Sequence, residues 1–175
     1  MHADPVTQAD PATLREELVR RWNERPHVED DPNWYELNEF GQWIVTPRAT
    51  HGHQQVAGEI MVQLVRQLGA RATMQVSVYT DRGIRVPDVV WMPAARWLEA
   101  KGQDPLLFVP DVCVEVVSPS NTRREILMKV GAYLRDGARE AIVAGLKGEV
   151  EFFGPGGKLE ASALGLKLQL PAELF

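Results

Sequence analysis

Two carboxylates occupy positions where folding does not require them. Asp88 follows Pro87 and precedes Val-Val-Trp, and Glu115 lies inside the run Cys-Val-Glu-Val-Val. A charged side chain among β-branched residues costs free energy to bury unless it is paired or binds a metal ion. Both residues are therefore candidate metal ligands. The alternative for Glu115 is a buried ion pair, with Lys129 as a candidate partner.

Two such carboxylates suit the hydrolysis of a phosphodiester bond. They can hold one or two Mg²⁺ ions with few protein ligands, which leaves the other coordination positions to water and phosphate oxygens. A bound metal ion lowers the pKa of its water and stabilises the charge that builds on the phosphate. A lysine then orients or activates that water, or stabilises the transition state electrostatically. We therefore expect Mg²⁺ as the cofactor, with Mn²⁺ able to replace it.

A longer pattern surrounds these two acids. It comprises RVPDVVW at residues 85–91 and PDVCVEVVSPS at residues 110–120, followed by Glu125, Lys129 and Tyr133. The upstream residues that agree with it are Tyr35-Glu36-Leu37, Gly41, Pro47, and His53 followed by Val56 and Ile60. The pattern covers roughly residues 34–170 and resembles the Uma family of proposed restriction endonucleases, which belongs to the PD-(D/E)XK nuclease superfamily.

The resemblance implies a catalytic role for three residues. Asp88 matches the metal-binding aspartate of the family, and Glu115 matches its second acidic ligand. The superfamily in its simplest form carries a lysine two residues after that acid, where this chain has Val117. The resemblance instead places the catalytic lysine at Lys129, on the following helix. A long lysine side chain can reach back from that helix toward the end of the strand.

Three further residues are expected to support the site. Glu125 and Tyr133 lie four residues before and after Lys129, so all three share one helix face. We expect Glu125 to hold Lys129 in position and Tyr133 to be its packing or hydrogen-bonding neighbour. His53 either contacts phosphate or orients a ligand, and the alternative is that it caps the helix that begins there.

The chain departs from the family pattern after Gly137. The family usually continues with a strand that carries an aromatic residue and ends in an aspartate. Residues 140–145 of this chain read Glu-Ala-Ile-Val-Ala-Gly and contain neither. This loss bears on the choice of substrate more than on metal binding.

The pattern of apolar residues predicts an α/β fold. Four-residue apolar spacing predicts helices, and alternating or continuous β-branched runs predict strands. The expected helices span 12–24, 53–68 and 122–135, and the expected strands span 34–37, 42–46, 73–79, 84–91, 109–117, 140–144, 150–153, 158–163 and 166–170. This order predicts a restriction-endonuclease-like core with a central mixed β-sheet flanked by helices. We expect residues 1–11 to be disordered and residues 12–175 to form a single domain.

Length and charge set further bounds. The chain has 175 residues, and no apolar run approaches the roughly 20 residues that span a bilayer. The polar N-terminus lacks the apolar core of a signal peptide, so we expect a cytoplasmic protein without membrane contact. The net charge is −5, but the acidic excess lies in residues 1–40, and the remainder is close to neutral. This distribution permits a DNA partner. The single cysteine, Cys113, is expected to be a small buried hydrophobe.

The preferred hypothesis is a Mg²⁺-dependent endonuclease that acts on nucleic acid, with DNA as the expected substrate. By analogy with enzymes that cut both strands, a homodimer is expected. The alternative is a binding or regulatory protein that keeps the fold with a weak or inactive site, and a third hypothesis is a metal-dependent hydrolase of another phosphodiester. Metal binding that requires Asp88 and Glu115 would separate the first two, and a substrate panel would separate the third.

Overall fold

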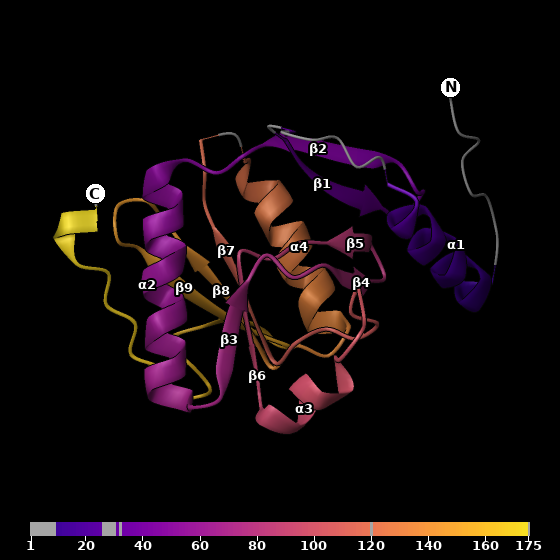
Figure 1. Cartoon of the computed structure of the whole chain (residues 1–175). Helices are drawn as coiled ribbons and strands as arrows, with labels where there is room; N and C mark the ends of the chain where they lie inside the picture. Colours follow the sequence, from indigo (N-terminus) through magenta and orange to yellow (C-terminus); the bar gives the residue numbers. More distant parts are fainter. Residues whose placement is uncertain (1–9, 26–30, 32, 120, 175) are drawn as a thin grey trace.

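The computed structural model describes residues 10–25, 31, 33–119 and 121–174. The chain forms two β-sheets and the helices that cover them (Figure 1). The helices are α1 (Pro11–Asn23), α2 (His51–Leu68), α3 (Ala94–Glu99) and α4 (Arg123–Arg135). The strands are β1 (Asn33–Asn38), β2 (Trp43–Pro47), β3 (Arg71–Met74), β4 (Val78–Thr80), β5 (Gly83–Arg85), β6 (Val89–Met92), β7 (Val112–Val116), β8 (Glu140–Ala144), β9 (Val150–Gly154) and β10 (Gly157–Leu159). A short 3₁₀ turn follows at Ala172–Leu174.

The larger sheet is the core of the fold. Its strand order is β10-β9-β8-β7-β6-β3, and the β7–β8 pair is parallel within an otherwise antiparallel sheet. Helix α2 packs on one face and α4 on the other, as Figure 1 shows. Every residue of β7 and β8 is buried, because both faces of these strands are covered. The predicted central mixed sheet flanked by helices is confirmed.

Each of the two helices packs against the sheet through its apolar stripe. Val56, Ile60 and Leu64 of α2 are fully buried against one face of the sheet, together with Val114. Ile126 and Val130 of α4 pack against the opposite face. Alternate residues of β7 point to opposite faces, so Glu115 faces α4 while Val114 and Val116 face α2.

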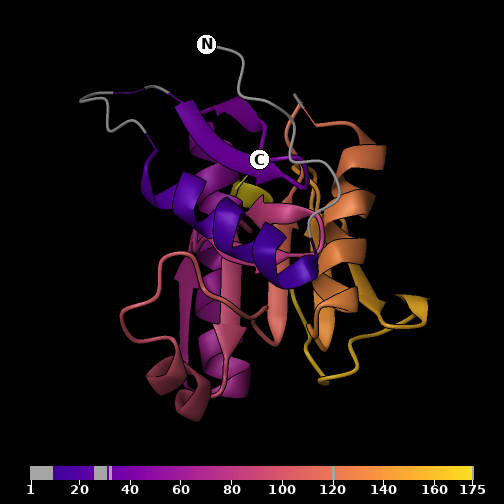
Figure 2. The same ribbon diagram turned by 90° about the vertical axis from the view of Figure 1, so that its right-hand side faces the viewer.

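The smaller sheet has the order β2-β1-β5-β4 and lies beside the larger one (Figure 2). Helix α1 covers one of its faces through Leu18 and Trp22, which pack with Leu37 of β1 and Ile84 of β5. Asp10 caps α1, so the helix begins at Pro11, and residues 1–9 of the predicted disordered segment lie outside the described residues. The other side of β1 presents Glu36, whose carboxylate contacts Lys129 of α4.

Two predicted strands are each divided between the two sheets. The prediction of one strand over 73–79 is wrong, because β3 ends at Met74 and β4 begins at Val78. Gln75 breaks the strand with a φ of 59°. The prediction of one strand over 84–91 is also wrong, because Pro87 interrupts it between β5 and β6. Proline has no N–H to donate to a ladder, so the chain leaves one sheet there and enters the other.

The C-terminal segment differs from the prediction as well. Residues 166–170 form no strand. Instead, Gln67 of α2 accepts from the backbone N–H of Lys167 and donates to its carbonyl, and Gln63 does the same for Gln169. The two amide side chains satisfy the backbone that a neighbouring strand would otherwise satisfy. In the described part of the chain, no helix has the length and apolar character needed to cross a membrane.

Candidate functional site

Asp88 and Glu115 lie opposite each other in the larger sheet: Asp88 immediately precedes β6, and Glu115 lies on the adjacent strand β7. The register pairs Val89 of β6 with Val114 of β7, so Asp88 stands opposite Glu115. Asp88 donates its N–H to the carbonyl of Val114 at 2.9 Å, and its Oδ2 accepts from the N–H of Val116 at 2.7 Å. Two backbone contacts therefore fix the aspartate beside the strand that carries the glutamate.

Glu115 is 3% exposed and is held by two side chains from α4. Its Oε2 accepts from Lys129 Nζ at 2.9 Å, and its Oε1 accepts from the Tyr133 hydroxyl at 2.6 Å. Lys129 and Tyr133 are one helical turn apart, which brings both side chains onto the face that packs against β7. Tyr133 therefore supports Glu115 directly, whereas the sequence had suggested Lys129 as its neighbour.

Glu36 joins the site from the smaller sheet and was not among the site residues predicted from the sequence. Its Oε1 accepts from Lys129 Nζ at 2.9 Å and from the N–H of Val86 at 2.9 Å, and its Oε2 lies 3.4 Å from Arg85 NH1. Lys129 is thus held between two carboxylates, Glu36 and Glu115, that belong to different sheets. The available indication was the Tyr-Glu-Leu segment, which places an acid within an apolar strand.

His53 is the third residue of α2, and its side chain points to Asp88. Its Nε2 is 3.3 Å from Asp88 Oδ2, and its side chain is almost completely buried. Thr50 caps α2 by accepting from the N–H of His53, so the capping alternative for this histidine side chain is wrong. Within the described residues, the other ring nitrogen, Nδ1, is buried without a hydrogen-bond partner. The side chain of His53 is therefore directed at the carboxylate of Asp88.

Glu125 does not take the position expected beside Lys129. It is exposed, and its carboxylate accepts from the backbone N–H of Thr122 at 2.7 Å and from the Thr122 hydroxyl at 2.8 Å. Thr122 in turn accepts from the N–H of Glu125, which completes a capping box at the start of α4. The spacing of four residues from Lys129 is correct, but the unsatisfied N–H groups of the helix start compete for the carboxylate.

Asp111 is a further buried acid near the start of β7, and it is 7% exposed. Arg96 of α3 donates to its Oδ2 at 2.5 Å and also to the carbonyl of Val109 at 3.0 Å. The ion pair offsets the burial of the carboxylate, so Asp111 ties α3 to the sheet and does not join the site. Cys113 is buried, as predicted.

Burial and neighbouring charges set the protonation of the site. Burial, followed by the carboxylates of Asp88 and Glu36, raises the pKa of Glu115 to about 7, against the opposing effects of Lys129 and Tyr133. Burial disfavours the charged form of Lys129, but Glu115 and Glu36 outweigh it and raise its pKa. Burial likewise opposes protonation of His53, but the hydrogen bond to Asp88 and the negative charges of Asp88 and Glu115 together outweigh this effect and raise the pKa of His53. Three carboxylates, from Glu36, Asp88 and Glu115, therefore act on one another and on Lys129 within one site.

These residues fit a divalent metal ion that takes few protein ligands. The mutual repulsion of Asp88 and Glu115, which contributes to the raised pKa of Glu115, would be relieved by a cation between them. Among the described residues, no three His, Cys, Asp or Glu side chains are gathered closely enough to hold a metal ion alone. Mg²⁺ commonly binds through one or two carboxylates and keeps several waters, so a pair of carboxylates suits it.

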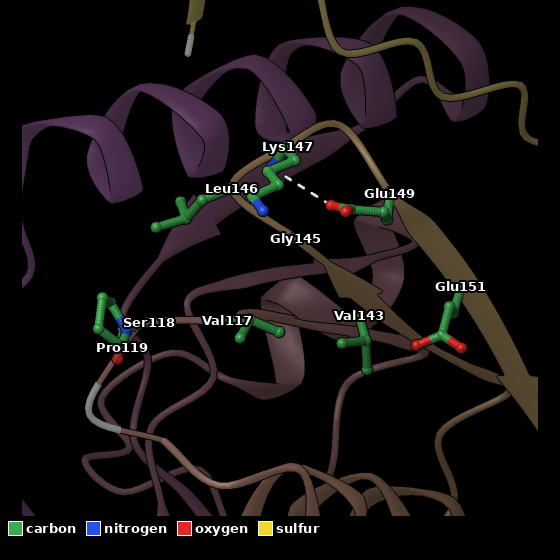
Figure 3. Close-up of a pocket in the computed structure, with 9 residues that line it drawn as sticks. All are labelled: Val117, Ser118, Pro119, Val143, Gly145, Leu146, Lys147, Glu149 and Glu151. Carbon is green, nitrogen blue, oxygen red and sulfur yellow. Dashed lines mark hydrogen bonds between the residues drawn. The ribbon is translucent and has the colours of Figure 1, made fainter.

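A cavity of about 500 Å³ lies at the carboxyl ends of β7 and β8, and its lining includes neighbours of Glu115 in the sheet but not Glu115 itself (Figure 3). Val143 of β8 pairs in register with Glu115, and Glu151 of β9 pairs with Val143. Side chains that stand opposite one another in a sheet share a face. The wall of the cavity is therefore the continuation of the row of side chains that begins with Glu115.

Comparison with known proteins places the chain in a family. The model of the Uma2 family, described as "Putative restriction endonuclease", matches residues 16–173. A solved structure, "a putative nuclease belonging to DUF820 from Anabaena variabilis ATCC 29413", superposes with a TM-score of 0.64 at 17% identity, covering 89% of this chain and 94% of that one. Its likeness shows that the two share a fold. Comparison with curated proteins gave no match. The chain belongs to the Uma2 family, as its sequence predicted.

Proposed function

We propose that this protein is a divalent-metal-dependent endonuclease that hydrolyses the phosphodiester bonds of DNA. The observation that carries the proposal is the position of Asp88, just before β6, opposite Glu115 of β7, with Lys129 Nζ at 2.9 Å from Glu115. Two acids and one lysine gathered in one site are the set that phosphodiester hydrolysis requires. The family description, which names restriction endonucleases, supports the same reaction.

Asp88 and Glu115 are the residues that would hold Mg²⁺ or Mn²⁺. When bound, the metal ion supplies an activated water and neutralises charge on the phosphate. The protein contributes the position of the ligands. His53 and the N–H of Val116 fix Asp88, and the Tyr133 hydroxyl fixes Glu115. Ligands held in this way lose little conformational entropy when the metal binds.

Lys129 is the cation that meets the negative charge of the substrate. Its pKa is raised, so it stays protonated and donates hydrogen bonds to a phosphate oxygen or to the attacking water. Burial between Glu36 and Glu115 lowers the number of conformations that its long side chain can adopt. An ammonium that is already oriented stabilises the transition state without reorganisation during the reaction.

The role of Glu36 is to position Lys129, and substitution tests it. In Glu36→Gln the charge that holds the ammonium is lost while the shape is kept, so we expect kcat to fall by about tenfold, as for loss of other orienting partners. KM and the affinity for Mg²⁺ should stay at wild-type values, because the proposed role of Glu36 involves contact with neither substrate nor metal.

The matched control for that experiment is Glu24→Gln, because Glu24 is exposed and pairs with Arg20 on α1. This control should keep wild-type kcat. A rise in KM without a change in kcat for Glu36→Gln would contradict the positioning role. So would an equal fall in kcat for both variants.

Nicking of supercoiled plasmid tests the proposed function. The protein with Mg²⁺ should convert supercoiled DNA to open circles, and EDTA should stop the reaction. An RNA of the same sequence tests the preference for DNA. Cleavage that is unaffected by EDTA, or no cleavage of DNA with Mg²⁺ or Mn²⁺, would contradict the proposal. A homodimer, which would place one site on each strand of a duplex, stays a prediction.

A further inference from the structure

The cavity beside Glu115 has walls whose chemistry differs from that of the site itself. Figure 3 shows Val117, Val143 and Glu151 along one side, and Leu146, Lys147 and Glu149 along the other. The apolar part comes from the two valines, Leu146 and Pro119. The polar part is formed mainly by carboxylates, with Lys147 as the basic residue of the lining.

The charges near the cavity do not favour a phosphate group. Arg123 and Lys158 both pair with the carboxylate of Glu151, so these two cations are already engaged. Glu149 carries a second negative charge, and its carboxylate accepts from the backbone N–H of Lys147 at 3.2 Å. A phosphate in the cavity would be repelled by the carboxylates of Glu149 and Glu151, while Arg123 and Lys158 are already paired with Glu151. A neutral, flat group with N–H donors would meet apolar walls and hydrogen-bond acceptors.

The position of the cavity selects which part of a nucleic acid can enter it. Val143 stands next to Glu115 across one strand spacing, about 4.8 Å. Val117 lies two residues further along the strand from Glu115, which is about 7 Å. A nucleotide whose phosphate lies at Asp88 and Glu115 carries its base within reach of these two valines.

We propose that this cavity binds the nucleobase of the nucleotide next to the scissile phosphate. This inference rests on the proposed function and adds the substrate class to it. A base inside a duplex is stacked and paired, so it must leave the stack to enter a protein pocket. The preferred substrate is therefore DNA in which this nucleotide is unpaired or easily extruded. The apolar walls take the faces of the base, and Glu149 and Glu151 accept from its amino or imino groups.

Gly145 offers a way to fill the cavity without changing its charges. It lines the cavity, and a Cβ built on it would lie 2.3 Å from Oε2 of Glu149, the end of a flexible side chain. Gly145→Val therefore places a branched side chain in the cavity and displaces the Glu149 carboxylate. Gly156→Val is the matched control, because a Cβ at Gly156 meets nothing within 4 Å.

The experiment compares two fluorescent single-stranded DNA oligonucleotides of the same length. One carries normal bases, and the other has abasic sites throughout. Binding is measured in Ca²⁺ by anisotropy for the wild type, Gly145→Val and Gly156→Val. We expect the wild type and Gly156→Val to bind the base-bearing strand roughly tenfold more tightly than the abasic strand. Gly145→Val should bind both strands with the affinity that the wild type has for the abasic one.

The outcomes separate this inference from the proposed function. Equal affinity of the wild type for both strands overturns the inference, even if the protein nicks plasmid. The same holds if Gly145→Val keeps the preference for bases, or if the wild type binds neither strand. A preference for bases that Gly145→Val removes supports the inference, even if no cleavage is seen. Unchanged affinity of Gly145→Val for the abasic strand shows that the variant is folded. As a further expected result, a duplex of the same sequence binds more weakly than the base-bearing strand.

Discussion

Asp88→Asn is expected to lose metal binding and cleavage together. Asparagine keeps the shape of the side chain and an oxygen that can accept from the N–H of Val116, so the fold should persist. It removes one of the two charges that would hold the metal ion. Loss of an orienting partner outside the metal shell already costs about 10- to 100-fold, so loss of a ligand should cost more than about 100-fold in cleavage rate.

Asp111→Asn is the matched control for this variant. Asp111 is a buried acid that immediately precedes β7, the strand that carries Glu115. It forms an ion pair with Arg96 at a distance of 2.5 Å, and this pair is not part of the site. We expect the control to lose about 1.5–3 kcal/mol of stability through the weakened hydrogen bond and to keep its cleavage rate. Thermal unfolding and plasmid nicking on both proteins measure this. A cleavage rate for Asp88→Asn within tenfold of wild type would contradict the assignment.

Lys129→Met is expected to impair both stability and catalysis. Methionine fills a similar volume but leaves Glu36 and Glu115 without their shared cation. Breaking a buried ion pair by removing one partner costs about 3 kcal/mol or more. Removal of one donor to the transition-state charge costs about 10² to 10³ in kcat. We therefore expect a folded but less stable protein with little cleavage activity.

Mg²⁺ should partly restore the stability of Lys129→Met, because a dication can replace the lost positive charge near Glu115. Its stabilising effect on this variant, measured as the rise in Tm, should exceed its effect on the wild type. Lys167→Met changes an exposed lysine near the C-terminus and serves as the control. It should match the wild type in stability and in activity. A Lys129→Met protein with wild-type kcat would show that the lysine is only part of a structural ion pair.

The sequence predicted the elements that carry a regular apolar stripe. Val56, Ile60 and Leu64 recur every four residues, and all three are buried on α2 as expected. The strands were harder to predict, because the apolar pattern of residues 84–91 does not reveal that the chain changes sheets within this segment. Pro87 marks the break, but a proline at an edge strand would read the same way from sequence.

The site was predicted in part for a similar reason. Asp88 and Glu115 stand out because an acid beside apolar residues is costly to bury. Glu36 was missed because its partner, Lys129, lies on a helix far along the chain, and no local spacing links them. Glu125 was misplaced because spacing identifies a helix face but does not decide between two partners. The carboxylate of Glu125 accepts from the backbone N–H of Thr122, a contact within the first turn of its own helix.

Calorimetric titration of Mg²⁺ and Mn²⁺ into the wild type and Glu115→Ala is the most direct test of the metal-dependent nuclease. Plasmid nicking is measured on the same samples. We predict that the wild type binds the metal and nicks DNA, and that Glu115→Ala, verified as folded by circular dichroism, does neither. Metal binding in both proteins would contradict the assignment of Glu115 as a ligand. If the wild type binds neither metal ion, the central claim is wrong and Glu115 is one half of a structural ion pair with Lys129.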